Sequence, residues 1–441
     1  MSAILLEGGR IIDGTGAEPR DGEALLIEGE RITEVGPGAL SQAPPDAERI
    51  DVSGLTVMPG LIDAHCHITF DEPSSNDELF FHRREGLGAL VAAFNVKKLL
   101  LAGVTGFLDA DVIYNLGVDL REAIDAGMVE GPRMVTGGNA LLTSVGGTAG
   151  KLIPDEGRRG YAGVVRNRDE MVLETRRQIK HGVDWIKIHV TGLIPRQRER
   201  GEIQVWTLDE LRCVCDTAHD LGIPVVAHCR NAESTRDAAR AGVDLILHAT
   251  FMDEAALEAV VEADTALCPT LTFQANLAEH GSKVGSAPEL QEMFRQEISG
   301  SSEMLRRAYA EGVPMLCGSE SGFSLTPYGH WHAREMEIFV EHLGMSSLQA
   351  ISCGTSEGAR ALKLEGEVGV LGSGFLADVI VVDGDPVADV RVLGDRRRLR
   401  HVFRGGRSVD LSQPWPERSA LPGHRVSNYS TQTLTWDLVN S

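Results

Sequence analysis

The sequence lacks the features that would place it on nucleic acid, in a membrane or in an oxidising compartment. Basic residues are in deficit, because 42 Lys and Arg stand against 64 Asp and Glu, for a formal net charge of −22. That balance argues against nucleic acid or an anionic membrane surface as a partner. No apolar run reaches the roughly 18 residues of a spanning helix. The first residues carry neither the basic segment nor the cleavage site of a signal peptide.

Cysteine and aromatic residues are also scarce. The seven cysteines are an odd number and lack the spacing of a disulfide framework, which favours reduced thiols. We therefore expect a cytoplasmic protein. With 42% hydrophobic, 24% charged and 5% aromatic residues, the composition is that of an ordinary globular chain. A length of 441 residues allows two or three domains, or one large barrel with an accessory domain.

Glycine recurs in one informative pattern. Five times it joins a helical pattern to a short β-branched run, at Gly103, Gly182, Gly222, Gly242 and Gly312. Gly is favoured just past a helix end because it tolerates positive φ. Helices that alternate with strands in this way predict a parallel sheet.

Eight strands are expected along the central region of the chain, near residues 55–67, 104–110, 132–138, 183–190, 223–229, 244–250, 266–273 and 314–320. Eight βα units predict an α/β fold of the (β/α)8 TIM-barrel type. A doubly wound open sheet is the alternative. It is weaker because no Gly-rich dinucleotide turn follows an early strand.

The two flanks differ from the centre. Both alternate short strands with Gly turns, and each is too small to bury a sheet alone, so we expect them to pair into one small β-sandwich domain. The predicted organisation is an N-terminal segment of the β-sandwich at 1–54, the barrel at 55–364, a C-terminal segment of the β-sandwich at 365–410 and an irregular C-terminal extension at 411–441. We expect a homo-oligomer, with the extension packed on a neighbouring subunit.

Chemically active residues fall at the predicted strand ends, where TIM barrels carry their active sites. They are His65 and His67 on the first strand, Lys187 on the fourth, His228 on the fifth, His248 on the sixth and Glu320 on the eighth. His65 and His67 are two apart, so they share a strand face, and paired imidazoles suit Zn²⁺, Co²⁺, Mn²⁺ or Fe²⁺. A lysine inside an apolar strand is costly unless it is paired or chemically changed.

These residues carry a family resemblance. The matching text is PGLIDAHCH at 59–67, WIKI at 185–188, AH at 227–228, LHATF at 247–251, GSESGF at 318–323 and GFLADVIVVDGDP at 374–386. The chain resembles the amidohydrolase superfamily of metal-dependent (β/α)8 hydrolases over essentially residues 1–410. It is most similar to the branch with a carboxylated lysine, which includes prolidase-like, imidazolonepropionase-related and ochratoxinase-like enzymes and the phenylurea and molinate hydrolases.

The resemblance implies a role for each residue. His65 and His67 would bind the more buried divalent metal, and His228 and His248 a second one. Lys187 would react with CO₂, and its carbamate would bridge the two metals. Glu320 would bind metal and shuttle a proton. Zn²⁺ is the first expectation, with Co²⁺, Mn²⁺ or Fe²⁺ as alternatives.

Two departures from the family pattern leave questions open. The strand-8 residue is normally Asp, and Glu320 is longer by one methylene, about 1.5 Å, so the site could hold one metal or two. Thr148 stands where many relatives place a substrate-facing His. Further candidate substrate contacts are His189, Tyr328, His330 and His332.

The implied function is hydrolysis of a C–N bond in a small molecule, such as an amide, a urea or a carbamate. A metal-activated hydroxide would attack the carbonyl carbon, and Glu320 would carry the proton to the leaving nitrogen. The alternatives are an N-acyl amino acid or dipeptide (prolidase-like) hydrolase, a heterocycle deaminase, against which Lys187 counts, and a non-catalytic metal-binding scaffold.

Overall fold

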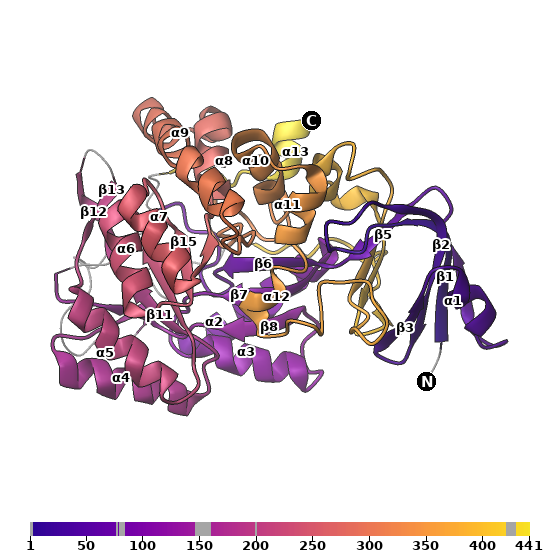
Figure 1. Cartoon of the computed structure of the whole chain (residues 1–441), viewed down its shortest axis with the longest axis horizontal. Coiled ribbons are helices and arrows are strands. Elements are labelled where there is room, and N and C mark those ends of the chain that lie inside the picture. Colours follow the sequence, from indigo (N-terminus) through magenta and orange to yellow (C-terminus); the bar gives the residue numbers. More distant parts are fainter. Residues whose placement is uncertain (1–2, 76–77, 79–83, 146–159, 199–200, 420–428) are drawn as a thin grey trace.

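The structure is a computed structural model. It describes residues 3–75, 78, 84–145, 160–198, 201–419 and 429–441. The fold is α/β, with parallel strands at the centre and a separate small sheet at one side (Figure 1). Within the described residues, no helix combines the length and apolar character needed to cross a membrane.

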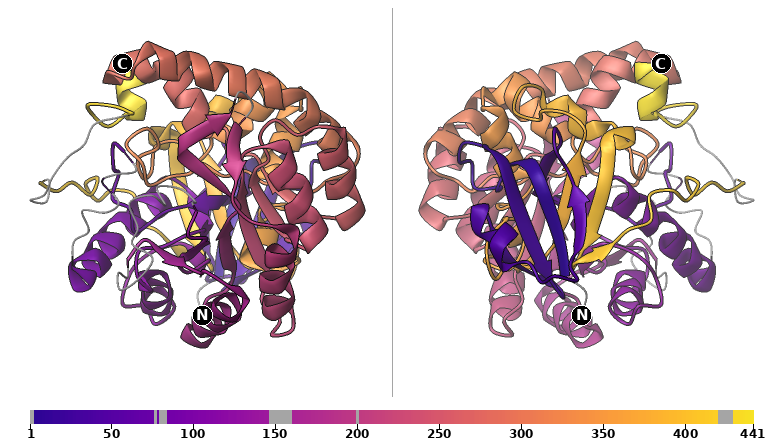
Figure 2. Two further views of the ribbon diagram at one scale, coloured as in Figure 1. Left: turned by 90° about the vertical axis from the view of Figure 1, so that its left-hand side faces the viewer. Right: turned by 90° about the vertical axis from the view of Figure 1, so that its right-hand side faces the viewer.

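The small sheet joins the two ends of the chain. The N-terminal end contributes β1 (Ala3–Ile11), β2 (Arg20–Glu28), β3 (Arg31–Val35), β4 (Glu48–Asp51) and β5 (Thr56–Pro59). The C-terminal end contributes β17 (Val379–Val382), β18 (Leu399–Arg404) and β19 (Arg407–Ser408). Helix α1 (Pro37–Gln42) lies beside β2. The strand order is β19-β18-β17-β5-β1-β2-β3, with β4 on β1. Figure 2 shows the indigo and yellow strands side by side. The predicted pairing of the two flanks is therefore present.

The central strands pair in parallel throughout. One sheet has the order β6 (Leu61–Cys66), β7 (Val104–Asp109), β8 (Arg133–Thr136). The other has the order β10 (Ala162–Val164), β9 (Ala140–Leu142), β11 (Ile186–His189), β14 (Val225–Cys229), β15 (Leu245–His248), β16 (Ala266–Cys268). A hairpin of β12 (Thr191–Arg198) and β13 (Gly201–Gln204) follows β11.

Helices connect these strands and lie outside them (Figure 1). They are α2 (Glu85–Leu101), α3 (Leu116–Asp125), α4 (Arg168–His181), α5 (Leu208–His219), α6 (Ala232–Ala241), α7 (Glu254–Ala263), α8 (Thr272–His280), α9 (Pro288–Ala310), α10 (Arg334–Leu343), α11 (Ser347–Cys353) and α12 (Ala359–Leu362). The five junction glycines all adopt positive φ, between 74° and 95°, as their place after a helix predicts.

The predicted first strand is two strands in two different sheets. β5 pairs with β17 in the small sheet, whereas β6 pairs with β7. They separate at Gly60, where a Cβ atom would meet Oγ1 of Thr105 at 2.1 Å. The change of sheet therefore falls at Gly60 and not at the expected boundary after residue 54.

The predicted eighth strand is not a regular strand. Residues 314–321 make isolated bridges, from Met315 to Leu267 and from Ser321 to Cys66. Backbone hydrogen bonds still tie this segment to β16 and β6, because Leu316 N donates to Leu267 O (2.8 Å) and Glu320 N donates to His65 O (2.8 Å). Glu320 has a φ of 54°, a conformation that a strand does not allow.

Strand alternation directs side chains to one of two cores. In β14, Val225 and Ala227 pack in the large cluster shared with the helices, while Val226 packs in a smaller cluster between the strands. Successive side chains on a strand point to opposite faces, so His228 shares the face of Val226. By the same rule Lys187 shares the face of Trp185, which is also in the smaller cluster.

The described residues of the C-terminal extension pack on their own chain. Trp331 Nε1 donates to Leu434 O (2.7 Å), and Thr431 N donates to Val284 O (2.7 Å). The extension ends in helix α13 (Trp436–Asn440), whose Trp436 ring lies 5.3 Å from that of Trp331.

Candidate metal centre

The predicted metal ligands come together at the strand ends. Ligand atoms of His65, His248 and Glu320 all lie within 4.8 Å of one another. The His67 ring centroid lies 4.8 Å from that of His65, and the His228 centroid lies 4.6 Å from that of His248. In the same register, Lys187 on β11 pairs with Val226 and His189 with His228.

The Lys187 side chain is enclosed and is only 1% exposed. No ion pair to its Nζ is found among the described residues. Burial lowers the pKa of Lys187, and the charges of Asp111 and Glu320 oppose that effect. A lysine with a lowered pKa offers more of the neutral amine, which is the form that reacts with an electrophile such as CO₂.

Burial favours the neutral, metal-binding form of three of the imidazoles. Burial lowers the pKa values of His65, His228 and His248 well below the usual range. His65 Nδ1 lies 3.0 Å from Oγ1 of Thr270, whose own proton goes to Cys268 O. His65 is therefore the donor in that contact, and its Nε2 keeps a lone pair for a metal.

His248 has no such partner. It is fully buried, and neither ring nitrogen has a hydrogen-bond partner among the described residues. Its φ of 71° is rare for a residue with a side chain. Regular alternation along β15 would place the His248 side chain on the face of Ile246, in the large cluster shared with the helices, and the positive φ breaks that alternation. A buried polar group without a partner is costly, and a metal ion bound to His248 would remove that cost. The donor set therefore fits a divalent metal of the Zn²⁺ class.

Asp111 is a central residue that the sequence patterns did not reveal. Its carboxylate is 1% exposed, lies 2.5 Å from His67 Nδ1 as an ion-pair contact, and is hydrogen-bonded to His189 Nε2 (2.8 Å). Burial opposes its charge, but His67 and Lys187 outweigh burial and hold the Asp111 pKa well below its usual range. Because Asp111 lies two residues after β7, a search of the second strand end would have found it.

A second group absent from the sequence prediction supports His228 from the β12–β13 hairpin. Glu202 Oε2 lies 3.1 Å from His228 Nε2 and accepts from Thr191 Oγ1 at 2.8 Å. Arg230 joins Glu202 (3.1 Å) to Glu297 (2.5 Å), and all three are buried. Nothing in the sequence indicates that this hairpin folds back onto the end of β14.

Glu320 lies beside His65 and His248, and its pKa is raised. Burial raises the pKa of Glu320 to about 7, against the opposing charges of His67 and Arg230. A carboxyl group with a pKa near the working pH can both accept and return a proton.

The predicted substrate contacts do not converge on this centre. Tyr328 is buried behind it, where its hydroxyl donates to His67 O (2.7 Å), and His330 lies against Trp415 of the extension (5.6 Å between ring centroids). His332 contacts Asp63 beneath β6. These placements follow from the chain reversal at the Phe323–Thr326 bridge and argue against the three predicted contacts.

Two predicted contacts remain. His189 lies beside the ligands, stacked on His228 at 5.0 Å between ring centroids. Thr148 lies outside the described residues.

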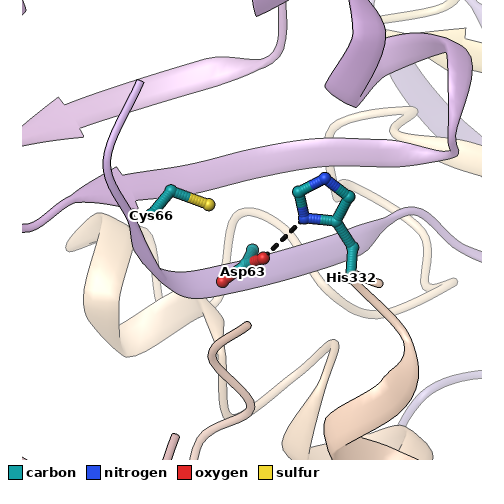
Figure 3. A group of neighbouring side chains, drawn as sticks. All are labelled: Asp63, Cys66 and His332. Carbon is teal, nitrogen blue, oxygen red and sulfur yellow. Dashed lines mark hydrogen bonds and ion pairs between the residues drawn. The ribbon is translucent and has the colours of Figure 1, made fainter. Parts of the chain in front are cut away.

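Asp63, Cys66 and His332 form a second cluster of possible ligands, in which Asp63 and His332 are hydrogen-bonded to each other (Figure 3). Asp63 accepts from His332 Nδ1 at 2.6 Å, and His332 Nε2 accepts from Gly329 N at 3.0 Å. Burial and the Asp63 charge raise the pKa of the Cys66 thiol well above its usual range. A metal would need the thiolate and free nitrogens, so these partners argue against a metal here.

Comparisons with known proteins identify the family of the chain. Residues 56–409 match the model of the amidohydrolase family. Ochratoxinase of Aspergillus niger is 25% identical, over 95% of this chain and 89% of the relative, and imidazolonepropionase of Erwinia tasmaniensis is 24% identical, over 87% and 92%. A crystal structure of a Xaa-Pro dipeptidase with bound methionine is 28% identical, with a TM-score of 0.79 over 92% of this chain and 100% of the other. Relatives with this fold imply a TIM barrel. The chain belongs to the amidohydrolase family and is a hydrolase that acts on carbon–nitrogen bonds.

Proposed function

We propose that the protein is a metal-dependent hydrolase that cleaves an amide, urea or carbamate-like C–N bond in a small molecule. The observation that carries the proposal is the convergence of His65, His248 and Glu320 within 4.8 Å, beside a buried lysine. His65 and His67 would hold one divalent metal, and His228 and His248 a second. Such a metal lowers the pKa of bound water from 15.7 to about 7 and polarises a carbonyl oxygen.

We infer that the central strands close into a (β/α)8 barrel beside a small β-sandwich. Asp184 N donates to Thr136 O (3.0 Å), which links β8 to β11. Residues 314–321 fill the gap between β16 and β6. Closure of the barrel would bring all six predicted ligands to the rim formed by the carboxyl ends of the strands.

Lys187 is proposed to be carboxylated. Its neutral Nζ would form a C–N bond to CO₂ and release one proton, which leaves a carbamate anion with two oxygen ligands. Burial supports this step because it favours the neutral amine. The same lysine counts against a heterocycle deaminase.

Glu320 is proposed to move the proton. It would accept a proton from the attacking water and return it to the leaving nitrogen, as general base and then general acid. Its pKa of about 7 suits both steps.

The surroundings favour a substrate with an aryl or other apolar group. Phe70 stacks on His67 with 4.3 Å between ring centroids, and Phe323 lies 5.7 Å from His67 and 5.5 Å from Phe70. An N-acyl amino acid or dipeptide is the second candidate, favoured by the likeness to the Xaa-Pro dipeptidase structure.

A substrate panel with and without chelator tests the proposal. Protein prepared with bicarbonate is assayed on N-acyl amino acids, Xaa-Pro dipeptides, aryl ureas and aryl carbamates. We expect hydrolysis of at least one class, lost with chelator and restored by Zn²⁺ or Co²⁺. Hydrolysis that survives removal of metal to less than about half an ion per chain would refute the proposal.

A further inference from the structure

One buried carboxylate gathers donors from both sides of the metal centre. Asp63 accepts from the backbone N–H of His65 (3.1 Å) and of Ser319 (3.0 Å). It also accepts from the Ser319 hydroxyl (2.5 Å) and from His332 Nδ1 (2.6 Å). Asp63, Ser319 and His332 are all buried, so each of these bonds is shielded from competing water.

The Ser319 hydroxyl extends this network past Glu320. It accepts from Ser321 N at 3.0 Å, while Glu320 N donates to His65 O at 2.8 Å. The peptide groups on both sides of Glu320 are thus fixed, and Glu320 between them adopts a φ of 54°. A conformation of this kind is unfavourable for a residue with a side chain and persists only where its surroundings enforce it.

The orientation of His332 is fixed as well. Its Nε2 accepts from Gly329 N at 3.0 Å, so the ring proton lies on Nδ1 and points to Asp63. Figure 3 shows this ring directed at the Asp63 carboxylate. The hydrogen bond between His332 and Asp63 therefore connects the loop after Glu320 to β6, the strand that carries His65.

We propose that Asp63, Ser319 and His332 form a positioning clamp that sets the place of Glu320 relative to His65. The clamp rests on the proposed role of Glu320 as a metal ligand and proton carrier. It also accounts for how a glutamate can serve at this position: the enforced left-handed turn, and not the side-chain length alone, directs the carboxylate. None of the three residues touches substrate.

Misplacement of a catalytic group by about 1 Å can lower the rate by about 100-fold. Loss of the clamp should therefore lower kcat by about 10- to 100-fold, in line with the effect of partners behind metal ligands, and change KM by less than about 3-fold. The substitution His332→Asn retains an N–H donor near the Nδ1 position, whereas His332→Leu removes it. Ser319→Ala removes the hydroxyl that accepts from Ser321 N. The matched control is Ser302→Ala, because Ser302 is also a buried serine, and its hydroxyl donates to Ile298 O within α9.

The test uses the full chain loaded with Co²⁺, whose visible absorption reports ligand geometry. We expect altered spectra, weaker Co²⁺ binding and lower kcat for His332→Leu and Ser319→Ala, with recovery in His332→Asn and no change in Ser302→Ala. Wild-type spectra and kcat in both His332→Leu and Ser319→Ala would overturn the clamp, as would equal losses in His332→Asn and His332→Leu. If the wild-type protein hydrolyses no compound of the panel, the proposed function fails, while the Co²⁺ spectra still decide the clamp.

Discussion

His65 and His248 are neighbouring imidazoles of one site that are held in opposite ways. Their ring centroids lie 5.4 Å apart. His65 donates to Thr270, and its backbone is held by Asp63. His248 has no partner on either nitrogen and adopts a φ of 71°. In the proposed metal centre, His65 would thus be oriented by the protein before metal binds, whereas a bound ion would supply the partner that His248 lacks among the described residues.

The largest effect is expected from Lys187→Ala, because both halves of the site depend on the carbamate. Hydrolysis should fall to background, and the metal bound per chain should decrease. Added acetate or formate, which can stand in for the carbamate, should restore some of the activity. Metal content by elemental analysis and rates with and without added carboxylate check this. Full activity in Lys187→Ala would show that the reaction needs no carbamate.

Glu320→Gln should lower kcat by about 10²- to 10⁴-fold, the usual contribution of a general acid–base group. As a base Glu320 must be deprotonated, so wild-type kcat/KM should fall as the pH falls through the pKa of Glu320. That limb should lie at or below pH about 7, since a bound metal lowers the pKa further.

The pH profile of Glu320→Gln should lose this acid limb. Glu365→Gln, on an exposed residue, is the control and should retain it. An acid limb that survives unchanged in Glu320→Gln would assign the base to another residue.

Asp111→Asn should weaken metal binding by about 10- to 100-fold, as expected when the partner of a ligating histidine is lost. The cause is the loss of the negative charge that lies 2.5 Å from His67 Nδ1. Competition with a chelator of known affinity measures the change. Unaltered affinity would show that His67 needs no such support.

The smallest effect is expected on the Tm, and it compares His65 with His248 directly. In chelator-treated protein, His65→Leu removes a hydrogen bond worth about 0.5–1.5 kcal/mol and should lower the Tm. His248→Leu removes polar atoms that have no partner, so it should leave the Tm unchanged or raise it. Differential scanning calorimetry of the two variants would contradict the comparison if His248→Leu were the more destabilising.

The sequence predicted those features of the molecule that local patterns determine. Junction glycines predicted the alternation of helix and strand, and all five adopt positive φ in the structure. The strand-end residues His65, Lys187 and His248 were found because each interrupts an apolar run. These signals need only the spacing of neighbouring residues.

Tertiary contacts determined what the sequence did not predict. Asp111 and Glu202 have no motif of their own and gain meaning only from the imidazoles that they contact. His332 was expected near substrate because it follows the eighth strand, but the chain reverses there and places it against Asp63. Positive φ at His248 and Glu320 was equally hidden, since neither residue favours that conformation.

Anomalous diffraction from crystals grown with Zn²⁺ and bicarbonate tests the central claim most directly. We predict one peak within bonding distance of His65 and His67, a second within bonding distance of His228 and His248, and carbamate density on Lys187. A map with no metal at these histidines and a bare Lys187 amine would contradict the proposed metal centre.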